Sequence, residues 1–250
     1  MSTQLELRFR SQTLGYNPRG YLAWQRRTKR VRLEPAQTAL LLCDVWDLHW
    51  ERGANERLAV MLPRIARVVD AARARGVQIV HAPSDTMAYY AGSPARLRVL
   101  QAPYCAPPAD LDHADPPLPI DDSDRGRDTN ANPGAVDQQV WTRQHPMIAV
   151  DPDRDAVSDD GGELYSFYRQ QQINTVLILG VHVNMCVLNR SFAIKQLVRW
   201  GLQTALLRDL TDSMYSPARP PYVDHASGTR LVVEYIEKFW CPTVASEEFL

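Results

Sequence analysis

A buried strand followed at once by a helix is the feature that most constrains the fold of this 250-residue chain. The apolar run at 175–179 predicts a short buried strand, 180–183 a tight turn, and 184–200 a helix with one apolar stripe. Asn184 is a good N-cap, which puts Cys186 in the first helical turn. There the backbone N–H groups and the helix dipole favour a thiolate, which attacks carbonyl carbon. Cys186 is therefore a candidate nucleophile, and the alternative is a small buried core residue.

The rest of the chain repeats this alternation. The run ALLLCDV at 39–45 predicts a central parallel strand buried on both faces, with Asp44 at its carboxyl end. Pro63 is expected to start or kink the helix that follows. Such alternation predicts an α/β fold, a single three-layer α-β-α domain with a mostly parallel, Rossmann-like sheet. The further strands are expected at 77–80, 147–150, 202–207 and 243–245, and the helices at 58–72, 95–100, 163–171 and 228–239.

Two segments stand apart from this pattern. Residues 1–35 carry aromatic and basic residues without a clear period, and are expected to form an arm packed over a domain at 36–250. Residues from about 83 to 139 are rich in Pro, Asp, Gly and Asn, which predicts a long loop insertion. A loop of this length covers a site, takes part in a subunit contact, or is a disordered insertion.

Composition narrows the function classes. The 28 basic and 29 acidic residues give a net charge of -1, so the overall balance favours neither nucleic acid nor an anionic membrane as a partner. The basic cluster at 26–32 is interpreted as a solvated arm or a subunit contact. Four scattered cysteines without C-x-x-C spacing indicate reduced thiols rather than a zinc site, and no apolar run is long enough to span a bilayer. These features predict a cytoplasmic protein with a small-molecule substrate.

Several polar residues follow predicted strand ends. Parallel sheets bind ligands beyond the carboxyl ends of their strands. Asp44, His81, Asp151 or Asp153, His182 and Cys186 are therefore expected to converge at one edge of the sheet.

The acid that closes the first buried strand and the segment GVHVNMCV resemble the isochorismatase-like cysteine hydrolase superfamily, which includes nicotinamidases, N-carbamoylsarcosine amidohydrolases and isochorismatases. The resemblance covers about 38–245. It implies Asp44 as the acid that takes the thiol proton and Cys186 as the nucleophile. It also implies a non-proline cis peptide between Val181 and His182, with the backbone N–H groups of His182 and Cys186 as oxyanion donors. A homo-oligomer, dimer or tetramer, is expected as well.

The chain departs from the family pattern at the third member of the triad. The family's lysine is expected within 151–154, but the chain has no lysine between Lys29 and Lys195. Arg154 is one candidate substitute, although its guanidinium does not exchange protons readily. His145 is the other candidate, because an imidazole does exchange them.

The substrate-binding candidates are Asp47, His49, Trp50 and His81. Nicotinamidases bind a metal after their second strand, whereas Asp47 and His49 follow the first. We therefore expect substrate contact or loop hydrogen bonding from these two rather than metal ligation, and neither metal nor cofactor is predicted. Trp50 is expected at an aromatic wall of the site or against the arm.

Three functional hypotheses follow. The first is hydrolysis of a small amide, imide or ureido compound through a Cys186 acyl-enzyme. The second is isochorismatase-type hydrolysis of a vinyl ether, with Asp44 as general acid and no covalent step. The third is a catalytically idle binding protein, suggested by the missing lysine.

Overall fold

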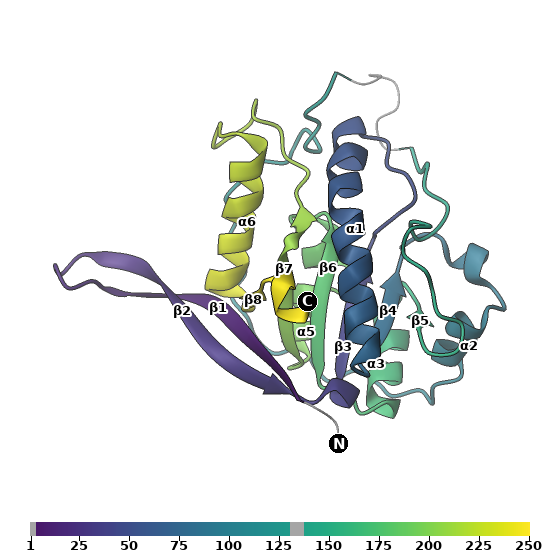
Figure 1. Ribbon diagram of the computed structural model, residues 1–250. Helices are drawn as coiled ribbons and strands as arrows, with labels where there is room; N and C mark the ends of the chain where they lie inside the picture. Colours follow the sequence, from purple (N-terminus) through teal and green to yellow (C-terminus); the bar gives the residue numbers. More distant parts are fainter. Residues whose placement is uncertain (1–3, 131–137) are drawn as a thin grey trace.

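The computed structural model describes residues 4–130 and 138–250, and within these residues the strands form one mixed sheet (Figure 1). Its strand order is β2-β1-β8-β7-β6-β3-β4-β5, and the pairs from β8 to β5 are parallel. This confirms the predicted α/β class. The strands are β1 (Leu5–Tyr16), β2 (Leu22–Leu33), β3 (Thr38–Cys43), β4 (Gln78–Ala82), β5 (Ala156–Val157), β6 (Thr175–Val181), β7 (Gln203–Asp212) and β8 (Thr243–Val244).

Helices cover both faces of this sheet. In β3, Leu40 and Leu42 pack in one hydrophobic cluster with α1, whereas Leu41 and Cys43 pack in the other with α3 to α6. Every residue of β3 is buried, as expected for a central parallel strand. The helices are α1 (Arg52–Ala74), α2 (Pro94–Leu100), α3 (Gly161–Gln170), α4 (Cys186–Asn189), α5 (Ile194–Arg199) and α6 (His225–Phe239), with short 3-10 turns η1 (Pro35–Gln37), η2 (Met87–Tyr90) and η3 (Ser246–Phe249).

The segment expected to form an arm over the domain has a regular structure. It is a hairpin of two twelve-residue strands, β1 and β2, paired from Leu5 with Leu33 to Tyr16 with Leu22. At its base, Leu5, Leu7 and Phe9 pack in the same hydrophobic cluster as α1. Its tip extends away from the body of the molecule (Figure 1). At the base, apolar and polar residues alternate with the period of a strand. The mostly exposed residues of β2 hide this period in the sequence.

Three local predictions were wrong. The helix at 184–200 is divided into α4 and α5 by a non-helical segment, 190–193. The strand expected at 147–150 is absent, and β5 at Ala156–Val157 takes the place beside β4. Pro63 was expected to start or kink its helix, and the first expectation is wrong because α1 begins at Arg52, with a buried face that runs from Gly53 to Ala72; the kink stays a prediction. Tertiary packing thus outweighs the proline signal.

The long insertion is ordered against the domain wherever the structure describes it. Its helix α2 confirms the short helix expected at 95–100. Further along, Cys105 bonds Ser166 of α3, and Asp115 forms an ion pair with Lys195 of α5. Among the described residues, no helix is long and apolar enough to cross a membrane.

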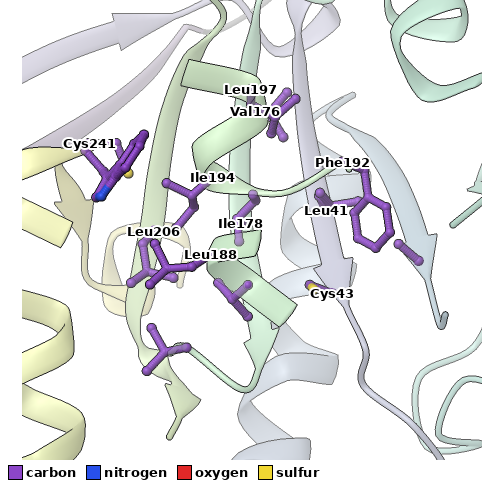
Figure 2. Packing of buried hydrophobic residues seen from close by; sticks show 14 of the residues in the cluster. Leu41, Cys43, Val176, Ile178, Leu188, Phe192, Ile194, Leu197, Leu206 and Cys241 are labelled. Atoms are coloured by element: carbon purple, nitrogen blue, oxygen red, sulfur yellow. The ribbon is translucent and has the colours of Figure 1, made fainter. Parts of the chain in front are cut away.

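The turn after β6 fits tightly against the end of β3. Gly180 has φ +123°, and a Cβ placed on it would lie 1.9 Å from the carbonyl oxygen of Cys43. Only glycine allows this approach. Behind the turn, Leu188 and Ile194 pack against Ile178 and Leu206 of the sheet (Figure 2). The glycine and this packing bring the residue after β3 beside the segment that carries Cys186.

Candidate active site

Asp44 stands directly after β3, at the carboxyl edge of the sheet, and is fully buried. Its backbone adopts the left-handed region, with φ +49°, and its N–H donates to the carbonyl of Ala82 at 3.0 Å. The backbone N–H of Ser84 donates to Oδ1 of the carboxylate at 2.7 Å. A non-glycine residue in this conformation is strained by about 1–3 kcal/mol and is typical of functional sites.

Cys186 lies in the first turn of a helix, as predicted, and its thiol lies beside the Asp44 carboxyl group. The cap of this helix is Met185 and not Asn184, whose side chain bonds Met214 and Asp122 instead. Cys186 and Asp44 thus form the pair that the sequence predicted, although 141 positions of chain separate them along the sequence.

Arg190 supplies the positive charge of this site. Its Nε donates to Oδ2 of Asp44 at 3.2 Å, and its Nη2 donates to Oδ2 of Asp85 at 3.4 Å. The backbone N–H of Arg190 bonds the carbonyl of Cys186, so the two residues stand one helical turn apart on one face. The sequence analysis missed this residue, and the i, i+4 spacing in CVLNR was the signal that could have found it.

Burial controls the proton affinities of the pair. Burial, followed by the Asp44 charge, raises the pKa of Cys186 to about 12, although Arg190 opposes the shift. The expected stabilisation of a thiolate by the helix terminus is therefore outweighed, because α4 is only one turn long. Burial also raises the pKa of Asp44, against Arg190 and the Ser84 N–H. The thiol of the resting pair is therefore protonated near pH 7.

The turn between β6 and α4 contains the predicted cis peptide between Val181 and His182. The backbone N–H of His182 is directed at the Cys186 sulfur, where it favours the thiolate. The His182 ring is buried edge-to-face against His49, with 5.0 Å between ring centroids. Burial lowers the pKa of His182 to about 3 and that of His49 to about 4, so both rings are neutral near pH 7.

Two hollows adjoin the pair. The first, which we call the cysteine hollow, is lined by Leu118, Asp122, Asn184, Met185, Cys186, Asn189 and Arg190. Asp44 lines the second, together with Trp46, His49 and His182. The Asp44–Cys186–Arg190 cluster therefore contributes residues to both hollows, one partly acidic and one small and aromatic.

The aromatic hollow contains part of the predicted substrate-binding set. His49 stacks with Trp141, and its ring lies 5.2 Å from that of Trp50. Trp46 stacks on Trp141 at 4.1 Å and donates to the carbonyl of Ser84. Trp50 thus belongs to an aromatic wall, whose stacking partner is Trp141, just after the insertion, rather than a residue of the arm.

Asp47 and His81 are placed elsewhere. Asp47 accepts from the backbone N–H groups of Thr142 and Arg143, the loop hydrogen bonding that was one of the two expectations for it. His81 is fully buried and pairs with Asp155 at 2.9 Å, and Asp155 also binds Arg73 of α1. His81 therefore holds the segment before β5 and does not line either hollow.

Neither predicted substitute for the lysine contacts Asp44 or Cys186. Arg154 is exposed, forms an ion pair with Asp151, and lies with Val77 and Gln78 at the opposite end of β4. His145 bonds Val45 through its backbone N–H, and its Nδ1 accepts from the N–H of Met147. Both candidates were placed by counting along the chain, whereas the structure brings a cation from the turn after the cysteine.

A second charged cluster lies behind the His182 turn. Arg57 of α1 binds Asp128 of the insertion and Asp212 at the end of β7, each at 2.7 Å. His225, the first residue of α6, bonds both of these aspartates. The backbone carbonyl of Asp212 accepts from Val183, so the cluster supports the turn. Within the described chain, no group of three or more His, Cys, Asp or Glu residues is placed to hold a metal ion.

Residues 38–219 match the family model described as the isochorismatase domain, a match over most of the chain. The chain belongs to the isochorismatase family. This family assignment confirms the resemblance and the assignment to a hydrolase class. A comparison with curated proteins finds no match.

Solved structures share the fold of this isochorismatase-family chain. A cysteine hydrolase from Pseudomonas syringae pv. phaseolicola 1448A has a TM-score of 0.52 and 16% identity, over 86% of this chain and 92% of the other. An isochorismatase from Pseudomonas putida KT2440 has a TM-score of 0.50 and 12% identity, over 86% and 91%. At such identities the likeness shows the isochorismatase-like α/β fold alone.

Proposed function

We propose that this family member is a cysteine hydrolase of small amide, imide or ureido compounds, with Cys186 as nucleophile. The observation that carries the proposal is that the Cys186 thiol lies beside a buried Asp44 carboxyl group that also meets Arg190. A thiol is activated by an adjacent base, and here the base is in contact with the nucleophile. The cysteine hollow gives a carbonyl compound access to the sulfur.

Asp44 carries one proton in each half of the proposed reaction. Asp44 takes the proton of the thiol as the sulfur attacks the carbonyl carbon, and returns it to the departing nitrogen when the C–N bond breaks. A thioester then joins the acyl group to Cys186. Water attacks this thioester while Asp44 takes its proton, and the proton returns to the sulfur when the acid leaves. Because the guanidinium of Arg190 stays protonated, Arg190 stabilises charge on Asp44 and on sulfur without transferring a proton.

The backbone N–H groups of His182 and Cys186 are the proposed oxyanion donors. The N–H of His182 already faces the sulfur in the structure, the side from which a tetrahedral intermediate forms. Donors held by the backbone need no reorganisation as charge develops on the oxygen. His49, Trp50 and the neighbouring tryptophans are proposed to bind the substrate from the aromatic side.

Hydrolysis of a vinyl ether is the second candidate, and the buried state of Asp44 favours it. Burial raises the pKa of this carboxyl, which makes it a better general acid for protonating a carbon–carbon double bond. In that reaction Cys186 is not required. Arg190 disfavours the protonated carboxyl, which is why we place this candidate second.

The deciding experiment compares Cys186→Ala and Asp44→Asn on a panel of small amides, imides, ureido compounds and vinyl ethers. The covalent route predicts that both variants lose turnover and that an acyl adduct on Cys186 is trapped by mass spectrometry. Cys105→Ala is the control, because Cys105 lies outside both hollows. Activity that survives Cys186→Ala but not Asp44→Asn would overturn the covalent route in favour of vinyl ether hydrolysis. Wild-type turnover in Cys186→Ala and Asp44→Asn alike would overturn both routes.

A further inference from the structure

The cysteine hollow carries a carboxylate that the proposed chemistry does not use. Asp122, from the long insertion, lines this hollow together with Cys186. Its Oδ2 accepts from Nδ2 of Asn184 at 2.8 Å, and no hydrogen bond to its Oδ1 occurs in the described structure. Asp122 therefore has one carboxylate oxygen without a hydrogen-bond partner among the described residues, in the hollow that Cys186 also lines.

Asn184 holds this carboxylate in place. It is 1% exposed, its Nδ2 also donates to the carbonyl of Met214, and its Oδ1 accepts from the Met214 N–H. All the hydrogen-bonding capacity of the amide nitrogen is thus in use, and the side chain cannot rotate without losing three bonds. Because the backbone fixes this buried amide, its hydrogen bond to Asp122 holds the carboxylate in one position.

The charge around the hollow is negative on balance. Arg190 is the cation that lines it, and this guanidinium is already shared between Asp44 and Asp85. Two carboxyl groups therefore flank one guanidinium, and Asp122 adds a further acidic side chain that forms no ion pair within the described residues. A pocket of one sign raises the local concentration of oppositely charged ligands and excludes those of like charge.

The apolar part of the lining fits the rest of such a ligand. Leu118 and Met185 line the hollow together with Asp122 and Cys186. Methylene groups bind against side chains of this kind, and methionine adapts to irregular shapes. A short methylene chain between a carbonyl and an ammonium group would therefore lie on Leu118 and Met185.

We propose that this site selects small carbonyl compounds that carry a protonated amine on a short methylene chain, with the ammonium group bound by Asp122 and the carbonyl at Cys186. The inference rests on the proposed function, because it takes Cys186 as the reacting group. Amides that carry a carboxylate are excluded by Asp122 and Asp85. Asp122 is a specificity residue under this proposal and takes no part in the proton transfer.

The test measures how the charge of a thiol reagent changes its reaction rate at Cys186. Aminoethyl, methyl and sulfonatoethyl methanethiosulfonates are cationic, neutral and anionic, and each forms a mixed disulfide with the thiolate as methanesulfinate leaves. Peptide mass spectrometry gives the rate at Cys186, and free glutathione gives the intrinsic rate of each reagent. Because the same thiolate reacts with all three, the cationic-to-anionic ratio is independent of the thiol pKa.

We expect the normalised cationic-to-anionic ratio to be at least about tenfold in the wild type and to fall by about fivefold in Asp122→Asn. Asp112→Asn, which removes an exposed carboxylate from the same insertion, is the matched control and should keep the wild-type ratio. Asp122→Lys should reverse the preference, and far-UV circular dichroism checks the fold of each variant.

A ratio near one in the wild type, or an equal ratio in Asp122→Asn and Asp112→Asn, would overturn the selectivity while leaving the proposed nucleophile intact. Failure of the neutral reagent to modify Cys186 in the folded wild type would instead overturn the proposed function, and the selectivity with it. The two failures are thus distinguished by the neutral reagent.

Discussion

Arg190 Nε lies 3.2 Å from Oδ2 of Asp44, a contact between residues 146 positions apart in the chain. Through this contact, the turn that carries the proposed nucleophile also carries the cation that balances its acid. Arg190 therefore stands near Asp44 as the cation of the proposed site, where the sequence analysis had expected a substitute for the family's lysine at Arg154 or His145. An arginine in this place fixes charge permanently, which leaves the proton transfer to Asp44.

Removing the guanidinium should disable the site. Arg190→Gln is expected to lower turnover by about a hundredfold, because charge developing on the sulfur and the carbonyl oxygen loses a nearby cation. The pKa of the Cys186 thiol should also rise further above its ordinary value, since Arg190 lowers it. Steady-state kinetics and the pH dependence of iodoacetamide labelling measure the two effects. Arg154→Gln is the control, and a comparable loss in that variant would contradict the assignment.

Asp44→Asn should separate thiol reactivity from turnover. The Asp44 charge is the second cause, after burial, of the raised Cys186 pKa of about 12. The variant should therefore have a lower thiol pKa and faster alkylation near neutral pH, by about tenfold for each unit of change. Turnover should nevertheless be lost with the proton carrier. Mass spectrometry of Cys186 measures the alkylation rate. Slower alkylation in Asp44→Asn than in the wild type would show that the carboxylate activates the free thiol instead.

Gly180→Ala should destabilise the fold or prevent folding. The added Cβ would lie 1.9 Å from the Cys43 carbonyl oxygen, at a backbone φ of +123°. We expect a loss of about 3 kcal/mol or more in the free energy of unfolding, measured by urea denaturation. Gly20→Ala is the matched control, since Gly20 has φ +80° but nothing within 4 Å of the added atom. It should cost only about 1 kcal/mol. Equal losses in the two variants would contradict the steric argument.

The His225 cluster should make stability depend on alkaline pH. Burial lowers the pKa of His225, but its bonds to Asp128 and Asp212 outweigh burial and raise it to about 9. A raised histidine pKa stabilises the fold fully below about pH 6.5, and the stabilisation disappears as pH rises through about 9. After allowance for solvent screening, we expect about 1–2 kcal/mol. Urea denaturation at several pH values should show this loss in the wild type and not in His225→Gln. The same pH slope in both proteins would be the contrary result.

The expected homo-oligomer stays a prediction, and the hairpin tip offers a test of it. Leu14 is paired with Trp24, and Tyr16 with Leu22, so these four partly exposed side chains share one face of the tip. Apolar surface of this kind marks protein contacts. Sedimentation velocity should show an oligomer that dissociates in Tyr16→Glu. Val60→Glu, at an exposed position of α1, should leave it intact. A monomeric wild type would contradict the prediction of a homo-oligomer.

Local patterns predicted most of the central sheet. The apolar run that became β3 is continuous because both faces of that strand are covered. Such a run can be recognised from a few neighbouring residues alone. Cys186 in a first helical turn and Asp44 at a strand end follow from the same patterns. The hairpin was missed because β2, with its row of exposed basic residues, lacks an apolar period.

The sequence by itself determined the α/β class and placed Asp44 at a strand end and Cys186 in a first helical turn, because strand periods and turn residues act over a few neighbouring positions. Only the tertiary structure decided that Arg190 balances this pair and that Asp122, held by Asn184, faces the cysteine hollow. It also decided that the thiol remains protonated. These properties arise from burial and from contacts between distant segments, and both exist only once the insertion and the strand ends have packed together.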